Sequence, residues 1–88
     1  MASFNIVFKT SAEKDLRSLP QSAIGRVLKQ IGLLASEPFP RQSLKLTGVE
    51  SLYRIRVGDY RIVYGVDKDA GRVIIHYVRH RHDVYRQL

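Results

Sequence analysis

Cysteine is missing from the chain, which excludes both a disulfide framework and a thiolate metal site. Long hydrophobic runs are missing as well, and no segment approaches the roughly 18 apolar residues that cross a membrane. The first ten residues, MASFNIVFKT, have no basic stretch leading into an apolar run, as a secretion signal would. We therefore expect a cytoplasmic protein without a membrane partner.

Acidic residues are scarce. Eight Asp and Glu stand against fifteen Lys and Arg, for a net charge of +7, and residues 41–88 hold ten of these basic residues and five of the acidic ones. Such an excess favours a polyanionic partner, which could be nucleic acid, an acidic protein or a membrane surface. A two-metal nuclease needs clustered carboxylates, whereas the acids here are scattered, so we expect neither a metal nor another cofactor. Six of these acids are Glu13, Asp15, Asp59, Asp67, Asp69 and Asp83.

The first half of the chain predicts one strand followed by two helices. Residues 4–8, FNIVF, are aromatic and β-branched, as in a strand. Thr10 and Glu13 have the spacing of a capping box, so we expect a helix to begin with Thr10 as its N-cap. Apolar residues then recur at helical spacing up to Leu34, with a break at Pro20. Residues 10–36 are therefore expected to form a helical hairpin.

The second half predicts three strands. Residues 52–57 and 60–66 alternate between apolar and polar, and the intervening Gly58-Asp59 suits a two-residue turn. Residues 72–78 form the third strand, and residues 79–88 close the chain as a short helix or tail. The order β-α-α-β-β-β over a single domain, residues 1–88, predicts an α+β fold in which a helical hairpin covers one face of a small antiparallel sheet.

The two-residue turn also fixes which side chains share a face of this hairpin. Arg56 lies opposite Arg61, and one face is apolar, while the other carries Arg54, Arg56 and Arg61. Directly opposed like charges destabilise a sheet by up to about 1 kcal/mol. A solvated face is one interpretation, but an opposed arginine pair with no nearby acid favours anion binding. The apolar face consists of Tyr53, Ile55, Val57, Tyr60, Ile62 and Tyr64.

The face on which Arg79 lies depends on the loop before the third strand. A loop with an odd number of residues, 67–71 or 67–73, places Arg79 on the same face as Arg61, whereas an even number places it in the core. Burying an unpaired arginine is costly. We therefore expect the odd-length loop and a fourth arginine on the basic face.

If the basic face cleaves RNA, other side chains are needed as general acid and general base to transfer protons. A histidine pair could form only among His76, His80 and His82. Of these, we expect His76 to pack within its strand, and the other two to lie in a basic tail. Tyr85 is the second candidate, because surrounding arginines would lower the pKa of its phenol; the alternative is that Tyr85 packs on the sheet edge.

Several segments together resemble the RelE-type toxins of the RelE/ParE toxin–antitoxin superfamily. The similarity covers nearly the whole chain and is carried by four segments. They are the helix of residues 12–19, LKLTG at 44–48, YRIRVGDYRIVY at 53–64 and VRHRHDVY at 78–85.

This resemblance implies the toxin of a type II system, a metal-independent endonuclease that enters the ribosomal A site, cuts mRNA codons and inhibits translation. The implied partners are a cognate antitoxin, the ribosome and mRNA. Arg61 and Arg79 would hold the phosphate and stabilise the transition state, while Tyr85 would orient or deprotonate the 2′-hydroxyl or stack on a base. The full implied set comprises Arg54, Arg56, Arg61, Arg79 and Tyr85 for catalysis and Lys45, Arg54, Arg56 and Arg81 for RNA binding.

One departure from the family pattern concerns Arg54 and Arg56, which match positions that are lysines in well-known RelE members. Lysine can lose its proton when its pKa is depressed, but arginine essentially cannot. The role of general base therefore shifts toward Tyr85. Two alternatives remain open, namely a ParE-like inhibitor of DNA gyrase and a basic RNA-binding domain or inactive toxin without chemistry.

Overall fold

The computed structural model describes residues 3–46 and 52–80. Two helices and five strands follow one another within these residues, and the strands form one sheet in the order β1-β5-β4-β3-β2. Their bounds are β1 Asn5–Phe8, α1 Thr10–Ser18, α2 Gln21–Leu33, β2 Leu44–Lys45, β3 Leu52–Val57, β4 Tyr60–Asp67 and β5 Arg72–His80.

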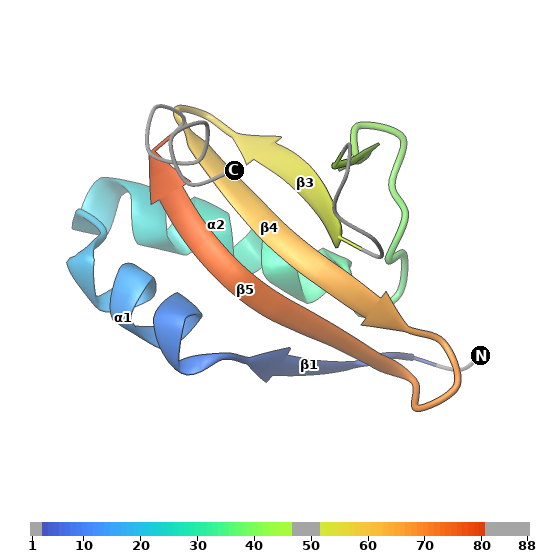
Figure 1. Ribbon diagram of the computed structural model, residues 1–88. Helices are drawn as coiled ribbons and strands as arrows, with labels where there is room; N and C mark the ends of the chain where they lie inside the picture. The colour runs from blue at the N-terminus through green and yellow to red at the C-terminus, as the bar shows by residue number, and fades with distance from the viewer. Residues whose placement is uncertain (1–2, 47–51, 81–88) are drawn as a thin grey trace.

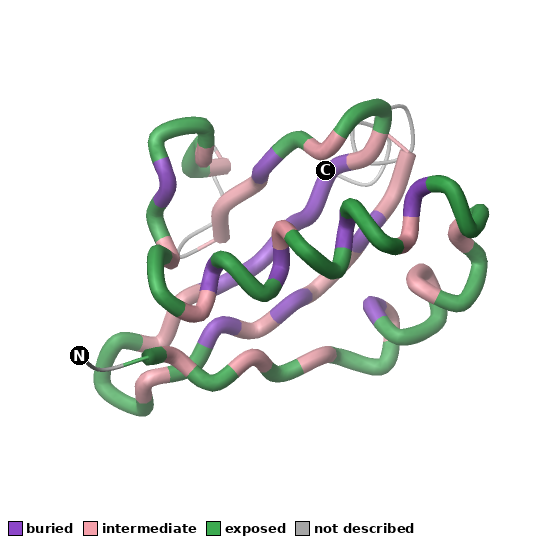
Figure 2. The backbone as a smooth tube through the Cα atoms, turned by 180° about the vertical axis from the view of Figure 1, so that it is seen from behind, coloured by how far each residue is buried: buried purple, intermediate pink, exposed green. Residues whose placement is uncertain are grey.

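Both helices lie against the same face of the sheet, so the expected α+β fold is confirmed (Figure 1). The core lies between the helices and the sheet, where apolar residues of both helices contact β3, β4 and β5. Seen from behind, α2 alternates between buried and exposed residues, as its apolar stripe predicts (Figure 2). The core residues are Ala12, Val27, Ile31, Leu34, Ile55, Ile62, Tyr64, Val73, Ile75 and Val78.

The central hairpin has the expected register. Val57 pairs with Tyr60, Arg56 with Arg61 and Tyr53 with Tyr64. Gly58 has a φ of 60°, which a two-residue turn of this type requires at its first position and which glycine adopts without strain. The turn thus sorts the hairpin into an apolar face toward the helices and a basic face away from them.

The connection between β4 and β5 differs from our expectation. Asp67 pairs with Arg72, which leaves a loop of four residues, an even number, so the predicted odd-length loop is wrong. Arg79 nevertheless pairs with Arg61, because the register shifts between Val63 and Tyr64. The shift arises from a β-bulge at His76, whose neighbours Ile75 and Tyr77 pair with consecutive residues of β4. The even-length loop alone would place Arg79 on the core face. The extra residue at the bulge shifts the pairing by one, so that Arg79 lies on the face of Arg61.

The start of the chain also differs in detail. β1 pairs with β5 in parallel, so the sheet is mixed where we expected an antiparallel one. The backbone N–H of Lys9 still donates to Ile75 on β5, and Lys9 is the N-cap of α1, without a side-chain capping bond. Thr10 is therefore already helical, and the predicted capping box does not form.

The loop after α2 is fastened to the core by Tyr64. Its hydroxyl donates a 2.8 Å hydrogen bond to the carbonyl of Pro38, and burial raises the pKa of this phenol, which keeps the donor protonated. The expected C-terminal helix or tail falls mainly on residues 81–88, outside the described residues. Neither helix of the described part of the chain has the length and apolar character needed to cross a membrane.

Candidate nucleic-acid interface

Three neighbouring strands bring three arginines side by side on the sheet face away from the helices. Arg61 of β4 lies between Arg56 of β3 and Arg79 of β5, as the direct cross-strand partner of both. Partners of this kind have Cβ atoms about 4.5–5.5 Å apart. We call Arg56, Arg61 and Arg79 the arginine row; the placement expected for Arg79 is confirmed.

Arg61 is the buried centre of the arginine row. Only 9% of the residue is exposed, and it is the only charged residue among those that the structure describes as buried. Its Nη1 atom has no hydrogen-bond partner within the described protein. A buried cation with an unsatisfied donor is costly, and the negative charge of an anion bound beside Arg61 would offset part of that cost. The site is therefore suited to an anion.

Arg79 is held from two sides. Its Nε donates to Oδ2 of Asp15 at 3.2 Å, and its guanidinium carbon lies 4.4 Å from the centre of the Tyr77 ring. The same Asp15 oxygen accepts a 3.1 Å hydrogen bond from the backbone N–H of Val78. An ion pair and a cation–π contact together define the position of this side chain.

Arg56 and Arg54 complete the basic face on β3. Arg56 is exposed, and its Nε donates to the carbonyl of Gly58 at 3.0 Å. Arg54 pairs with Val63 on one side and with Leu44 on the other, so it lies further from the arginine row along β3. Planar guanidinium groups on adjacent strands offer several N–H donors to the oxygens of a phosphate.

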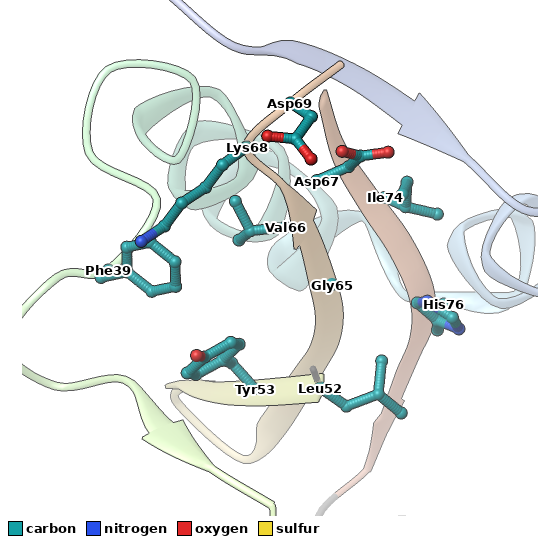
Figure 3. A pocket seen from close by; sticks show the side chains of 10 residues that line it. All are labelled: Phe39, Leu52, Tyr53, Gly65, Val66, Asp67, Lys68, Asp69, Ile74 and His76. Carbon is teal, nitrogen blue, oxygen red and sulfur yellow. The ribbon is translucent and has the colours of Figure 1, made fainter. Parts of the chain in front are cut away.

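The opposite end of the sheet holds a cavity of about 700 Å³. Figure 3 shows that its lining mixes apolar side chains with the carboxylates of Asp67 and Asp69. Gly65 contributes only backbone there, between Leu52 and Ile74 on the flanking strands. The lining consists of Phe39, Leu52, Tyr53, Gly65, Val66, Asp67, Lys68, Asp69, Ile74 and His76.

No group of three or more His, Asp or Glu side chains suited to a metal ion occurs within residues 3–46 and 52–80. The arginine row itself offers positive charge and hydrogen-bond donors. These can bind a phosphodiester and stabilise the additional negative charge of a phosphorane.

Comparison with known proteins identifies the family of this chain. A model described as "ParE toxin of type II toxin-antitoxin system, parDE" matches residues 6–85. The toxin RelG of Mycobacterium tuberculosis is 31% identical over 85 residues, covering 96% of this chain and 98% of RelG. The toxin RelE3 of Methanocaldococcus jannaschii is 33% identical over 88 residues, covering 91% of this chain and 93% of RelE3.

This chain belongs to the RelE/ParE family of type II toxins. Its fold agrees with that of the family. A chain in the crystal structure of the RelBE2 toxin–antitoxin complex of Mycobacterium tuberculosis superposes with a TM-score of 0.80 at 31% identity, over 91% of this chain and all of that chain.

Some predicted site residues of the toxin do not join the arginine row. Lys45 pairs with Tyr53, so the register gives it the side of the sheet that faces the helices. His80 is the last residue of β5, where we expected a tail, and its ring contacts Tyr60 at 5.7 Å between centroids on that same side. Arg81, His82 and Tyr85 lie outside the described residues.

His76 lies in β5, as expected, but it forms the bulge. Its carbonyl accepts a 2.7 Å hydrogen bond from the hydroxyl of Ser11 at the start of α1. Burial of the ring, with a smaller contribution from the positive charge of Lys9, lowers the pKa of this imidazole. His76 is thus a neutral structural residue above its pKa and not a member of the arginine row.

Two residues of the toxin's site were not anticipated from the sequence, Asp15 and Tyr77. Asp15 was grouped with the scattered acids, although it follows Ala12 by three residues and precedes Leu19 by four, which puts a carboxylate within the apolar stripe of α1. That position was the available signal. Tyr77 precedes Arg79 by two residues, the spacing at which strand residues share a face.

Proposed function

We propose that this toxin is a metal-independent endoribonuclease that cuts mRNA in the ribosomal A site and so inhibits translation. The observation that carries the proposal is Arg61, a buried guanidinium with an unpaired Nη1 that lies between two further arginines. Its relatives carry the names toxin RelG and toxin RelE3. A ribosomal substrate also implies that the toxin acts in the cytoplasm.

In the proposed reaction, Arg61 and Arg79 bind the scissile phosphate and stabilise the charge that develops on its oxygens. Arg56 and Arg54 lead from this point along β3 and would contact neighbouring phosphates. Arginine is a poor proton donor and acceptor at its usual pKa. We therefore assign activation of the 2′-hydroxyl to Tyr85 and further RNA contacts to Arg81 and Lys45.

The test is a cell-free translation reaction in which mRNA breaks are mapped by primer extension. We expect breaks at translated codons with the wild-type toxin and none with Arg61→Ala combined with Arg79→Ala. Arg72→Ala is the matched control, since Arg72 is an exposed arginine on the same face of β5. Breaks outside translated codons, or breaks that persist in the double variant, would refute the proposal.

We further propose that an antitoxin neutralises this toxin by direct binding. The solved relative from Mycobacterium tuberculosis is a toxin–antitoxin complex, and the net charge of +7 favours an acidic or amphipathic partner segment. Co-expression with the product of the adjacent reading frame should yield a stable complex. Purification of the toxin alone from such cells would argue against this partner.

A second candidate function is inhibition of DNA gyrase, because the matching family model carries the ParE name. It requires no catalytic arginines. DNA damage with intact mRNA after induction, unchanged in the double arginine variant, would favour it over mRNA cleavage. A Tyr85→Phe variant as toxic as the wild type, with no mRNA breaks, would favour a basic binding domain without chemistry.

A further inference from the structure

The contact between Asp15 and Arg79 joins α1 to the arginine row. One carboxylate oxygen of Asp15 accepts both the backbone N–H of Val78 and the side-chain Nε–H of Arg79, at 3.1 and 3.2 Å. The side chains of Arg79 and Asp15 are 23% and 18% exposed, respectively. A largely desolvated carboxylate with two donors is a stronger constraint on its partners than a surface ion pair.

The position of Asp15 follows from the topology. β1 pairs with β5 only from Arg72 to Ile75, and the chain then turns into α1. Beyond the bulge, α1 takes the place of β1 along this edge of β5, with Ser11 bonded to the carbonyl of His76 and Asp15 to the N–H of Val78. Asp15 thus replaces a strand partner and is close enough to reach the next side chain.

The two restraints on Arg79 leave a defined part of it available. Asp15 occupies the Nε–H, and the guanidinium carbon lies over the Tyr77 ring, 4.4 Å from its centre. The four N–H donors on the two Nη atoms are not used by either restraint. Arg61, the direct cross-strand partner of Arg79, has its own unpaired Nη1.

We propose that Asp15 is a positioning residue, which fixes the guanidinium of Arg79 so that its Nη atoms bind the scissile phosphate together with Arg61. The proposal rests on the proposed nuclease function. It assigns to an acidic residue a positive contribution to cleavage of a polyanion, through the orientation of Arg79.

Simple electrostatics predicts the opposite effect. Neutralising Asp15 raises the net charge of the protein, which should strengthen RNA binding and leave cleavage equal or faster. If Asp15 positions Arg79, the same change should slow the chemical step without weakening RNA binding, because misplacement of a reacting or stabilising group by about 1 Å costs up to roughly 100-fold in rate. The two accounts therefore predict different effects of neutralising Asp15 on the cleavage rate: no change or an increase from electrostatics alone, and a decrease if Asp15 positions Arg79.

The experiment compares Asp15→Asn with Glu13→Gln under single-turnover conditions on programmed ribosomes. Asparagine retains an oxygen that can accept the Val78 N–H, and thermal unfolding verifies that the fold is kept. Glu13 is an exposed acid on the same helix, so its variant gives the same change of net charge. We expect Asp15→Asn to cut about 10- to 100-fold more slowly with an unchanged or lower Kd for ribosomes, and Glu13→Gln to cut at the wild-type rate.

A double-mutant cycle with Arg79→Ala tests whether Asp15 acts through Arg79. The effect of Asp15→Asn should largely disappear when Arg79 is already absent, since contacting residues are coupled whereas independent ones are additive. Wild-type cleavage by Asp15→Asn, or an equal loss in both backgrounds, would overturn the inference and leave the nuclease function intact.

Failure of the nuclease function itself is recognised separately, as absence of cleavage by the wild-type toxin. The inference is then decided by the NMR signal of the Arg79 side-chain Nε–H in the free protein. Slow solvent exchange of this proton in the wild type and in Glu13→Gln, with fast exchange in Asp15→Asn, would support the positioning. An unchanged exchange rate in Asp15→Asn would overturn it.

Discussion

The two ends of one sheet face carry arginines in contrasting surroundings. Arg72, at the start of β5, lies opposite the acid Asp67 and is exposed. Arg61, in the same sheet, lies opposite an arginine on each side and is buried. Opposite charges across strands stabilise a sheet and like charges destabilise it, so only the end with Arg61 gains from a bound anion.

The same contrast holds for shape. The cavity at the end near Arg72 is lined mainly by apolar residues and the acids Asp67 and Asp69, with Gly65 contributing only backbone (Figure 3), while a smaller hollow of about 460 Å³ at the other end is lined in part by Arg79 and Asp15. Between them lies the bulge at His76, which turns Arg79 toward Arg61. The cluster of arginines at this end therefore depends on the bulge in β5 as well as on the number of arginines in the strands.

The largest effect is expected when the bulge is removed. Deletion of His76 would reverse the alternation of residues 77–80 and direct Arg79 to the core, a buried and unpaired charge. We expect the free energy of unfolding to fall by roughly 3–5 kcal/mol, or folding to fail, as measured by urea denaturation. His76→Ala keeps the residue count and should be far milder; equal stability of the two variants would contradict this role of the bulge.

The next effect sharpens the comparison between the two arginines. Arg61→Lys keeps the charge but loses the planar fork of donors, so we expect mRNA cleavage to slow by roughly 100-fold. Arg72→Lys should leave the rate unchanged. Similar rates for both variants in the translation assay would mean that positive charge alone determines the cleavage rate, and that the guanidinium geometry of Arg61 does not contribute.

A smaller effect is expected at the turn that sets the hairpin register. Gly58 has a φ of 60°, and an alanine in this conformation costs roughly 1–2 kcal/mol of stability. Gly25 on α2 has open space around its Cα, so Gly25→Ala should stabilise the helix by about 0.5–1 kcal/mol. Thermal unfolding of both variants checks the prediction, which is wrong if their effects have the same sign.

The smallest effect concerns pH. The folded pKa of His76 lies below its ordinary value of 6.5, so the unfolded chain binds more protons as the pH falls. Its contribution to stability is therefore fully present above about pH 6.5 and is lost as pH falls toward the folded pKa. The melting temperature should decrease slightly between pH 7.5 and pH 5.5, and less so in His76→Gln; an identical decrease in both proteins would exclude His76 as its source.

The sequence predicted the fold class and the central hairpin because their determinants are local. The Gly58-Asp59 turn dictates which residues pair, and alternation then separates Tyr, Ile and Val from the arginines. The parallel pairing of β1 with β5 could not be inferred in this way, since it depends on contacts between the two ends of the chain.

The candidate site was predictable in part. Arg79 was placed on the correct face, but through an odd-length loop that does not exist; a bulge carries no signal in a pattern of alternation. Asp15 was overlooked because its partners are 63 and 64 residues away along the chain. The contribution of Lys45 to RNA binding stays a prediction, and its pairing with Tyr53 gives Lys45 the side of the sheet that faces the helices.

The central claim, that the arginine row holds the phosphate, is tested most directly by NMR on toxin labelled at its arginine side chains. A short single-stranded RNA is titrated into the sample while the Nε–H signals are followed. We predict that the signals of Arg61 and Arg79 shift together and saturate, while that of Arg72 remains in place. A shift of Arg72 as large as that of Arg61, or no shift of Arg61, would contradict the claim.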